Sequence, residues 1–195
     1  MLERFRPLLK KILEPIAKQM NINPNIITLI SPFIAVISAL FFGTGNLLIG
    51  GLFILFSGIF DVLDGAIARY HNRSSDFGAF LDSTMDRFSD AIIIIGLMWG
   101  GYTTWLIGAL AIHSAITVSY VRASAESKGI PCNVGIAERA TRLIILVIGA
   151  FIAVIFNNNM LMNWAVLLMV ILAYITVVQR IYHVWKLTSH ERRHL

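Results

Sequence analysis

Charged residues are scarce in this sequence. Only 14% of its 195 residues are Asp, Glu, Lys or Arg, whereas soluble domains carry about 25%. Hydrophobic residues make up 57% of the chain and the mean hydropathy is +0.74. This balance excludes an ordinary soluble globular protein and predicts an integral membrane protein. The length allows several spans of roughly 20 residues each, with little left over for a soluble domain.

Cysteine is almost absent as well. The single Cys132 excludes an internal disulfide and a cysteine-rich metal site. The first residues interleave charged and apolar side chains, so we expect no cleaved signal peptide there. The net charge of +5 does not predict a nucleic-acid partner, because the basic residues flank apolar segments.

Residues 1–21 carry apolar side chains at near-helical spacing with Arg and Lys between them. This pattern predicts a basic amphipathic helix on the membrane surface, broken or kinked at Pro15. A solvated helix packed on a partner is the alternative.

Six apolar runs follow, and they predict six transmembrane helices. They cover approximately residues 26–42, 47–61, 78–99, 102–124, 136–156 and 162–182. The expected organisation is an all-α membrane domain over residues 22–187 and a basic cytoplasmic tail over 188–195.

The loops predict the orientation of these helices. Residues 43–46, 100–104 and 157–163, which follow the first, third and fifth runs, contain no Lys or Arg. Because Lys and Arg favour the cytoplasmic side, both termini are expected there. The protein is therefore expected to be a multi-pass protein of the cell membrane.

Four carboxylates stand out in the apolar background. Asp61 and Asp64 are three residues apart, and Asp82 and Asp86 are four apart, so each pair shares one face of a helix. Charges inside a span are costly and need a reason. Two such faces brought together form an oxygen-only site for a hard divalent cation, with Mg²⁺ or Mn²⁺ as natural occupants. The loop charges place this site at the cytoplasmic face.

Glycines accompany the carboxylates, where a backbone must come close to a bulky ligand. The full pattern is Asp61-x-x-Asp64-Gly65-x-x-Ala68-Arg69, eight residues, and Gly78-x-x-x-Asp82-x-x-x-Asp86. It resembles the signature of the CDP-alcohol phosphatidyltransferase family without a departure. Simple ion pairing of the acids with Arg69, Arg73 and Arg87 would require neither the glycines nor this spacing.

The resemblance implies transfer of a lipid-phosphate group from a CDP-linked lipid to an alcohol, with release of CMP, by a homodimer. By the same resemblance, Asp61, Asp64 and Asp82 hold the metal, with two ions expected. Asp86 is the implied general base and also a candidate ligand. Two cations suit this chemistry because they neutralise charge on the pyrophosphate as its bond breaks.

The resemblance also implies a nucleotide site. Gly65, Ala68 and Arg69 match its central part, with Asp61 and Gly78 beside them. In addition, Pro24-Asn25-x-x-Thr28 matches a short element that faces the nucleotide in this family, which adds Asn25 and Thr28. As an alternative, Asn25 caps the first helix.

The acceptor is suggested by basic residues in the second half of the chain. Arg139 and Arg142 lie at an expected helix N-terminus, where the dipole favours anions over cations. The elements Tyr120-x-Arg122-Ala123 and Glu138-Arg139-x-x-Arg142 resemble the archaeal and actinobacterial family members that use inositol 1-phosphate. The implied phosphate pocket consists of Arg122, Arg139 and Arg142, with Arg180 as a further wall. Glycerol 3-phosphate is the alternative acceptor, and ordinary flanking charge is the alternative role for the arginines.

Two further points remain open in the sequence. Apolar walls accept the chains of CDP-archaeol and CDP-diacylglycerol alike, and only the likeness to archaeal members favours archaeol. A secondary transporter is the rival class of protein, although its usual second, repeated set of buried polar residues is missing here.

His113, inside the fourth run, is expected to pack through one hydrogen bond rather than to relay protons.

Overall fold

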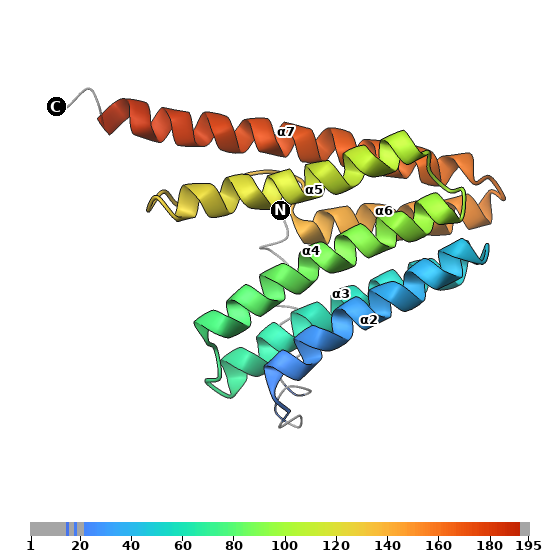
Figure 1. The fold of residues 1–195 in the computed structure, drawn as a ribbon, viewed down its shortest axis with the longest axis horizontal. Coiled ribbons are helices and arrows are strands. Elements are labelled where there is room, and N and C mark those ends of the chain that lie inside the picture. Colours follow the sequence, from blue (N-terminus) through green and yellow to red (C-terminus); the bar gives the residue numbers. More distant parts are fainter. Residues whose placement is uncertain (1–14, 16–17, 19–21, 192–195) are drawn as a thin grey trace. The chain divides into compact units, whose positions relative to one another are not determined.

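The computed structural model describes Pro15, Lys18 and residues 22–191. Within these residues there are six helices and no strand (Figure 1). They are α2 (Pro24–Gly43), α3 (Leu47–Tyr70), α4 (Asp76–Trp99), α5 (Trp105–Glu126), α6 (Arg139–Ile155) and α7 (Met160–Glu191). The predicted all-α class is therefore confirmed. Apart from Pro15 and Lys18, the amphipathic segment expected at 1–21 lies outside the described residues, as does the tail from 192 to 195.

Four of the six helices are long and apolar enough to cross a membrane: α2, α3, α5 and α7. The other two helices, α4 and α6, do not meet these requirements of length and apolar composition. The first half of α4 carries Asp76, Asp82, Asp86 and Arg87, and α6 has only 17 residues. Helices of this length and composition support a membrane protein.

Some helix ends differ from the expected runs. The second run was expected to end near Asp61, but α3 continues to Tyr70. The fifth run was expected to begin as a helix at Ile136, but α6 begins at Arg139 because the chain before it is extended and Gly135 has a φ of 121°. The sixth run was expected to end at Tyr182, yet α7 continues to Glu191. Apolar character therefore located the runs but not the ends of the helices.

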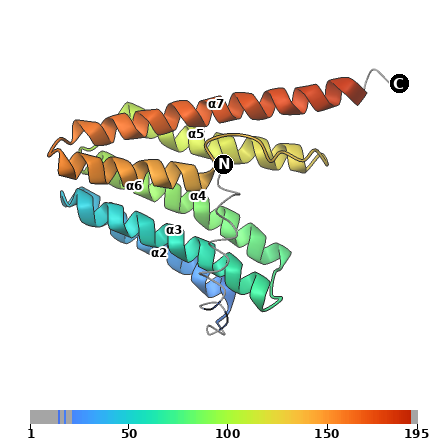
Figure 2. The same cartoon turned by 180° about the vertical axis from the view of Figure 1, so that it is seen from behind.

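The chain divides into two compact units, residues 1–100 and 101–195. In the first unit α2 packs against both α3 and α4, and Figure 2 shows α2 and α3 side by side. Small residues make this close packing possible: a Cβ at Gly96 of α4 would collide with the backbone of Ala39 on α2. Ser38 on α2 donates a 2.8 Å hydrogen bond to the carbonyl of Gly50 on α3.

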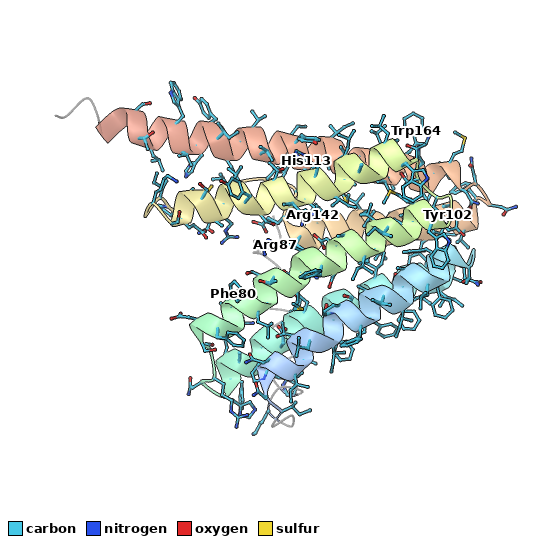
Figure 3. The ribbon with its side chains drawn as sticks, viewed as in Figure 1. Phe80, Arg87, Tyr102, His113, Arg142 and Trp164 are labelled. Carbon is cyan, nitrogen blue, oxygen red and sulfur yellow. The ribbon has the colours of Figure 1, made fainter. Side chains whose placement is uncertain are left out.

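In the second unit α7 packs against both α5 and α6. At one end, the Thr103 hydroxyl before α5 donates to Asn163 Oδ1 on α7 at 3.0 Å. A Cβ at Gly149 of α6 would collide with Ala165 of α7. In mid-helix, His113 on α5 (labelled in Figure 3) lies 2.9 Å from the Tyr174 hydroxyl of α7. The prediction that His113 packs through one hydrogen bond is thus confirmed.

Candidate active site

The helical hairpin formed by α3 and α4 brings three of the four motif carboxylates together. Asp61 comes from the second half of α3, while Asp82 and Asp86 lie on successive turns of α4. One carboxylate oxygen from each residue lies within 4.8 Å of the others, and all three side chains are half-buried. The donors are oxygen only and they converge, which fits a hard divalent cation.

Asp64 on α3 is the fourth motif carboxylate, and a residue of α2 holds it through a hydrogen bond. It is buried, at 5% exposure, and its Oδ2 accepts a 2.7 Å hydrogen bond from the Thr28 hydroxyl of α2. Thr28 Oγ1 also lies 3.2 Å from the carbonyl of Pro24. Since a carboxylate has two oxygens, this bond is compatible with a metal contact through the other one.

The motif glycines lie against polar side chains rather than in open space. A Cβ at Gly65 would come 3.1 Å from Arg69 Nη1, so the guanidinium of Arg69 folds back over Gly65. A Cβ at Gly78 would come 3.2 Å from Asn25 Oδ1. The structure therefore brings Asn25 to the first turn of α4, the helix that also carries Asp82 and Asp86.

Asn25 does not cap α2, so that alternative is wrong. The N-cap is Asn23, whose side chain accepts a 3.1 Å hydrogen bond from the Asn25 amide. Asn25 and Thr28 lie one turn apart in the first two turns of α2, one next to Gly78 and the other bonded to Asp64. Both residues of the short sequence element thus contact the motif. Ala68 lies in the last turn of α3 and is half-buried.

The basic residues lie in the second unit, around the segment between α5 and α6. We call residues 127–138 the α5–α6 linker. Arg122, in the last turns of α5, donates from Nε to Glu126 Oε1 and from Nη2 to Asn133 Oδ1, both at 2.8 Å. Its guanidinium is therefore held between a helix and the linker.

The two arginines of α6 lie on its first turn (Arg142 is labelled in Figure 3). Arg142 is buried, at 4% exposure, and its Nη1 donates a 3.1 Å hydrogen bond to the carbonyl of Ala137. The terminal nitrogens of Arg139 are also buried. The helix N-terminus therefore gathers positive charge that its own dipole disfavours, an arrangement that an anion would stabilise.

Arg180 on α7 completes this basic group. It is 2% exposed, and its guanidinium donates to the carbonyls of Val134 (2.9 Å) and Val118. It lies within electrostatic range of Arg122 and Arg142. The Arg180 guanidinium thus connects α7 to α5 and to the linker through hydrogen bonds to their backbone carbonyls.

Several residues of these sites escaped the sequence analysis. Glu126 and Asn133 hold Arg122, and Thr176 of α7 contacts the linker. Thr176 lies inside an apolar run and Asn133 in a polar loop. Neither position carries a local signal, because their partners come from other elements.

Comparison with known proteins agrees with the geometry. The family model of the CDP-alcohol phosphatidyltransferases matches residues 21–178. The chain therefore belongs to the CDP-alcohol phosphatidyltransferase family and is a transferase of phospholipid biosynthesis. This membership places it among enzymes rather than among secondary transporters.

Individual relatives match over nearly the whole chain. The archaetidylinositol phosphate synthase of Methanothermobacter thermautotrophicus is 45% identical over 186 residues, which cover 95% of each protein. The crystal structure of Mycobacterium tuberculosis phosphatidylinositol phosphate synthase with CDP-DAG bound is 32% identical. It superimposes with a TM-score of 0.80, over 90% of this chain and 94% of that one. The same mycobacterial enzyme in complex with manganese and citrate gives a TM-score of 0.80 at 31% identity, over 89% of this chain and 88% of that one.

Proposed function

We propose that this enzyme transfers a lipid-phosphate group from a CDP-linked lipid to inositol 1-phosphate and releases CMP. The observation that carries the proposal is the convergence of Asp61, Asp82 and Asp86 within 4.8 Å, inside the family's motif. The relatives named as inositol phosphate synthases, and the relative with CDP-DAG bound, support the acceptor and the donor.

The metal site in this proposal consists of Asp61, Asp64 and Asp82, with Asp86 beside them as the base and a candidate further ligand, and it holds Mg²⁺ or Mn²⁺ as two ions. The manganese complex of the mycobacterial relative supports a divalent metal. When bound, the ions neutralise charge on the pyrophosphate and so favour departure of CMP. Thr28 orients the Asp64 carboxylate through its 2.7 Å hydrogen bond.

Asp86 acts as the general base. The acceptor hydroxyl oxygen forms a bond to the lipid-bearing phosphorus, and the bond from that phosphorus to the phosphate oxygen of CMP breaks. CMP leaves with the bonding electrons, and Asp86 holds the proton of the hydroxyl. Asp86 lies one turn beyond Asp82 on α4, and its carboxylate is one of the three that converge within 4.8 Å, which supports this role.

The nucleotide lies over the glycines of the α3–α4 hairpin. Gly65 and Gly78 let the backbone approach it, and Asp61, Ala68 and Arg69 of α3 line the same place. Asn25 supports the assignment because its side-chain oxygen lies beside Gly78, and Thr28 is tied to the motif through Asp64. Arg69, exposed and folded over Gly65, is positioned to move onto a phosphate.

The acceptor phosphate binds the basic group of the second unit: Arg122, Arg139 and Arg142, with Arg180 as a wall. Planar guanidinium groups suit a phosphate because they donate paired hydrogen bonds. Glycerol 3-phosphate offers the same anion and is the alternative acceptor. For the lipid, the 45% identity to an archaetidylinositol phosphate synthase favours CDP-archaeol over CDP-diacylglycerol.

The membrane arrangement follows the loop charges. We propose six spans over residues 22–187, with α4 and α6 crossing alongside the four apolar helices. In this proposal residues 1–21 lie on the membrane surface. Residues 188–195 form a cytoplasmic tail, and α7 continues into the first part of this tail, as far as Glu191. Both termini and the active site face the cytoplasm, and the enzyme is a homodimer in the cell membrane. Labelling of single cysteines in the loops from outside the cell tests this topology, and an external terminus contradicts it.

Release of CMP tests the reaction. Purified protein is supplied with CDP-archaeol or CDP-diacylglycerol, Mg²⁺ or Mn²⁺, and one acceptor at a time. We expect CMP with inositol 1-phosphate and none when metal is chelated. CMP with glycerol 3-phosphate alone would overturn the acceptor while keeping the family chemistry. Absence of CMP with every phosphorylated and free alcohol would overturn the proposed function.

A further inference from the structure

One face of α7 holds the α5–α6 linker. Thr176, Arg180 and His183 are spaced by four and three residues, so they lie on the same side of the helix. The Arg180 guanidinium donates to the Val134 carbonyl at 2.9 Å, and His183 Nε2 donates to the Pro131 carbonyl at 3.1 Å. The linker is thus attached to α7 at successive points up to the start of α6.

Thr176 makes the last of these attachments, immediately before α6. Its hydroxyl accepts hydrogen bonds from two consecutive backbone amides, Ile136 at 3.2 Å and Ala137 at 2.9 Å. The same hydroxyl donates to the carbonyl of Leu172 at 2.9 Å. One donor and two acceptor positions are all a hydroxyl has, so its hydrogen-bonding capacity is fully used. Thr176 is 0% exposed, so water does not substitute for these bonds.

The methyl group of Thr176 adds a second constraint. Gly135 has a φ of 121°, a conformation that residues with a Cβ rarely adopt. A Cβ built there would collide with the Thr176 Cγ2 atom. The linker backbone therefore lies directly against the Thr176 side chain, and its conformation is matched to this contact.

The residue held by Thr176 is also the one that contacts Arg142, through the peptide group on the other side of its Cα. The amide of Ala137 donates to Thr176, and the carbonyl of Ala137 accepts from Arg142 Nη1 at 3.1 Å. Ala137 is itself 0% exposed. The α6 N-cap, Glu138, makes no side-chain capping bond of its own. Thr176 thus anchors to α7 the two residues that lie just before this N-cap.

We propose that Thr176 is a positioning residue for the acceptor site: its hydroxyl holds the amides of Ile136 and Ala137, and the carbonyl of Ala137, in the next peptide group, orients the Arg142 guanidinium. This inference rests on the proposed function, because it takes Arg142 as a phosphate-binding residue. Thr176 does not touch substrate. It sets the direction in which a buried guanidinium presents its remaining donors to the acceptor phosphate.

The test compares Thr176→Val with Thr176→Ser in the full-length enzyme. Thr176→Val keeps the shape but leaves two buried amides without an acceptor, so we expect the KM for inositol 1-phosphate to rise about tenfold. The KM for the CDP-lipid stays within about twofold, because the α3–α4 hairpin is untouched. Thr176→Ser keeps the hydroxyl and retains the wild-type acceptor KM. Thr188→Val is the matched control, since Thr188 on the same helix bonds only to backbone carbonyls of α7.

A double variant shows whether the effect passes through Arg142. If Thr176 acts by orienting that guanidinium, Thr176→Val changes the acceptor KM little in an Arg142→Ala background. Equal acceptor and donor effects of Thr176→Val, or a full additional effect in the Arg142→Ala background, would overturn the inference. If Thr176→Val does not fold, Thr176→Ala replaces it, because the smaller side chain leaves room for a water. The same two results in Thr176→Ala would overturn the inference.

Failure of the proposed function gives a different result. In that case the wild-type enzyme itself releases no CMP with inositol 1-phosphate. Hydrogen exchange then still reports on Thr176: we expect the amides of Ile136 and Ala137 to exchange faster in Thr176→Val than in Thr176→Ser. Equal exchange in the two variants would show that Thr176 does not hold the linker.

Discussion

The hydroxyl of Thr28 on α2 donates a 2.7 Å hydrogen bond to Oδ2 of Asp64 on α3. The two residues lie 36 positions apart in the sequence, and each is 5% exposed. The bond connects a helix without acidic residues to the acidic motif. It therefore gives α2 a part in the geometry of the proposed metal site.

Replacing Thr28 by Val should weaken metal binding. The substitution removes the donor that orients Asp64, and loss of such a supporting bond typically costs about 10–100-fold in metal affinity or activity. The measurement is CMP release as a function of Mn²⁺ or Mg²⁺ concentration. Thr28→Ser keeps the hydroxyl and should need the same metal concentration as wild type. An unchanged metal requirement in Thr28→Val would show that this bond does not support the site.

Replacing Asp86 by Asn should abolish turnover while the metal still binds. The amide cannot accept the proton of the acceptor hydroxyl, so the chemical step loses about 10²–10⁴-fold. Mn²⁺ binding is followed by electron paramagnetic resonance on the same preparation. Asp61→Asn is the comparison variant and should lose metal binding and turnover together. Loss of metal binding in Asp86→Asn would make Asp86 a ligand rather than the base.

Replacing Arg142 by Ala should affect the acceptor far more than the donor. A hydrogen bond to a charged group contributes about 1.5–3 kcal/mol, which corresponds to an increase of about 10–100-fold in the acceptor KM. Lys128→Ala is the control, because Lys128 is a basic residue of the same linker that bonds only to Ser124. Equal increases in the acceptor and donor KM would remove Arg142 from the acceptor site.

Replacing Gly96 by Ala should destabilise the first unit. The new Cβ would collide with the backbone of Ala39 on α2, and a backbone cannot rotate away as a side chain can. Overpacking of this kind costs about 1–3 kcal/mol. Thermal unfolding in detergent measures the effect. Ile95→Val changes an exposed neighbour on the same helix and should leave the unfolding temperature nearly unchanged.

Much of the architecture could be predicted because its signals are local. Long apolar runs predicted the six described helices, four of which are long and apolar enough to cross a membrane, and spacings of three and four placed carboxylates on common faces of α3 and α4. Asp61, Asp82 and Asp86 do converge. The ends of the helices were less predictable. Helix α6 begins at Arg139, directly after a segment that Thr176 holds by hydrogen bonds. No feature of residues 136–138 in the sequence predicts that contact.

By itself, the sequence determined that the protein is an all-α membrane protein and that its acidic pairs share faces of α3 and α4. Those properties depend on composition and on spacing within one helix. Only the tertiary structure decided which side chains hold the candidate site residues in place: Thr28 for Asp64, Asn133 for Arg122, and Thr176 for Ala137, the residue whose carbonyl contacts Arg142. Each of these partners comes from a different element of the fold. Their contacts are created when helices pack, and packing brings together residues whose separation in the sequence carries no signal.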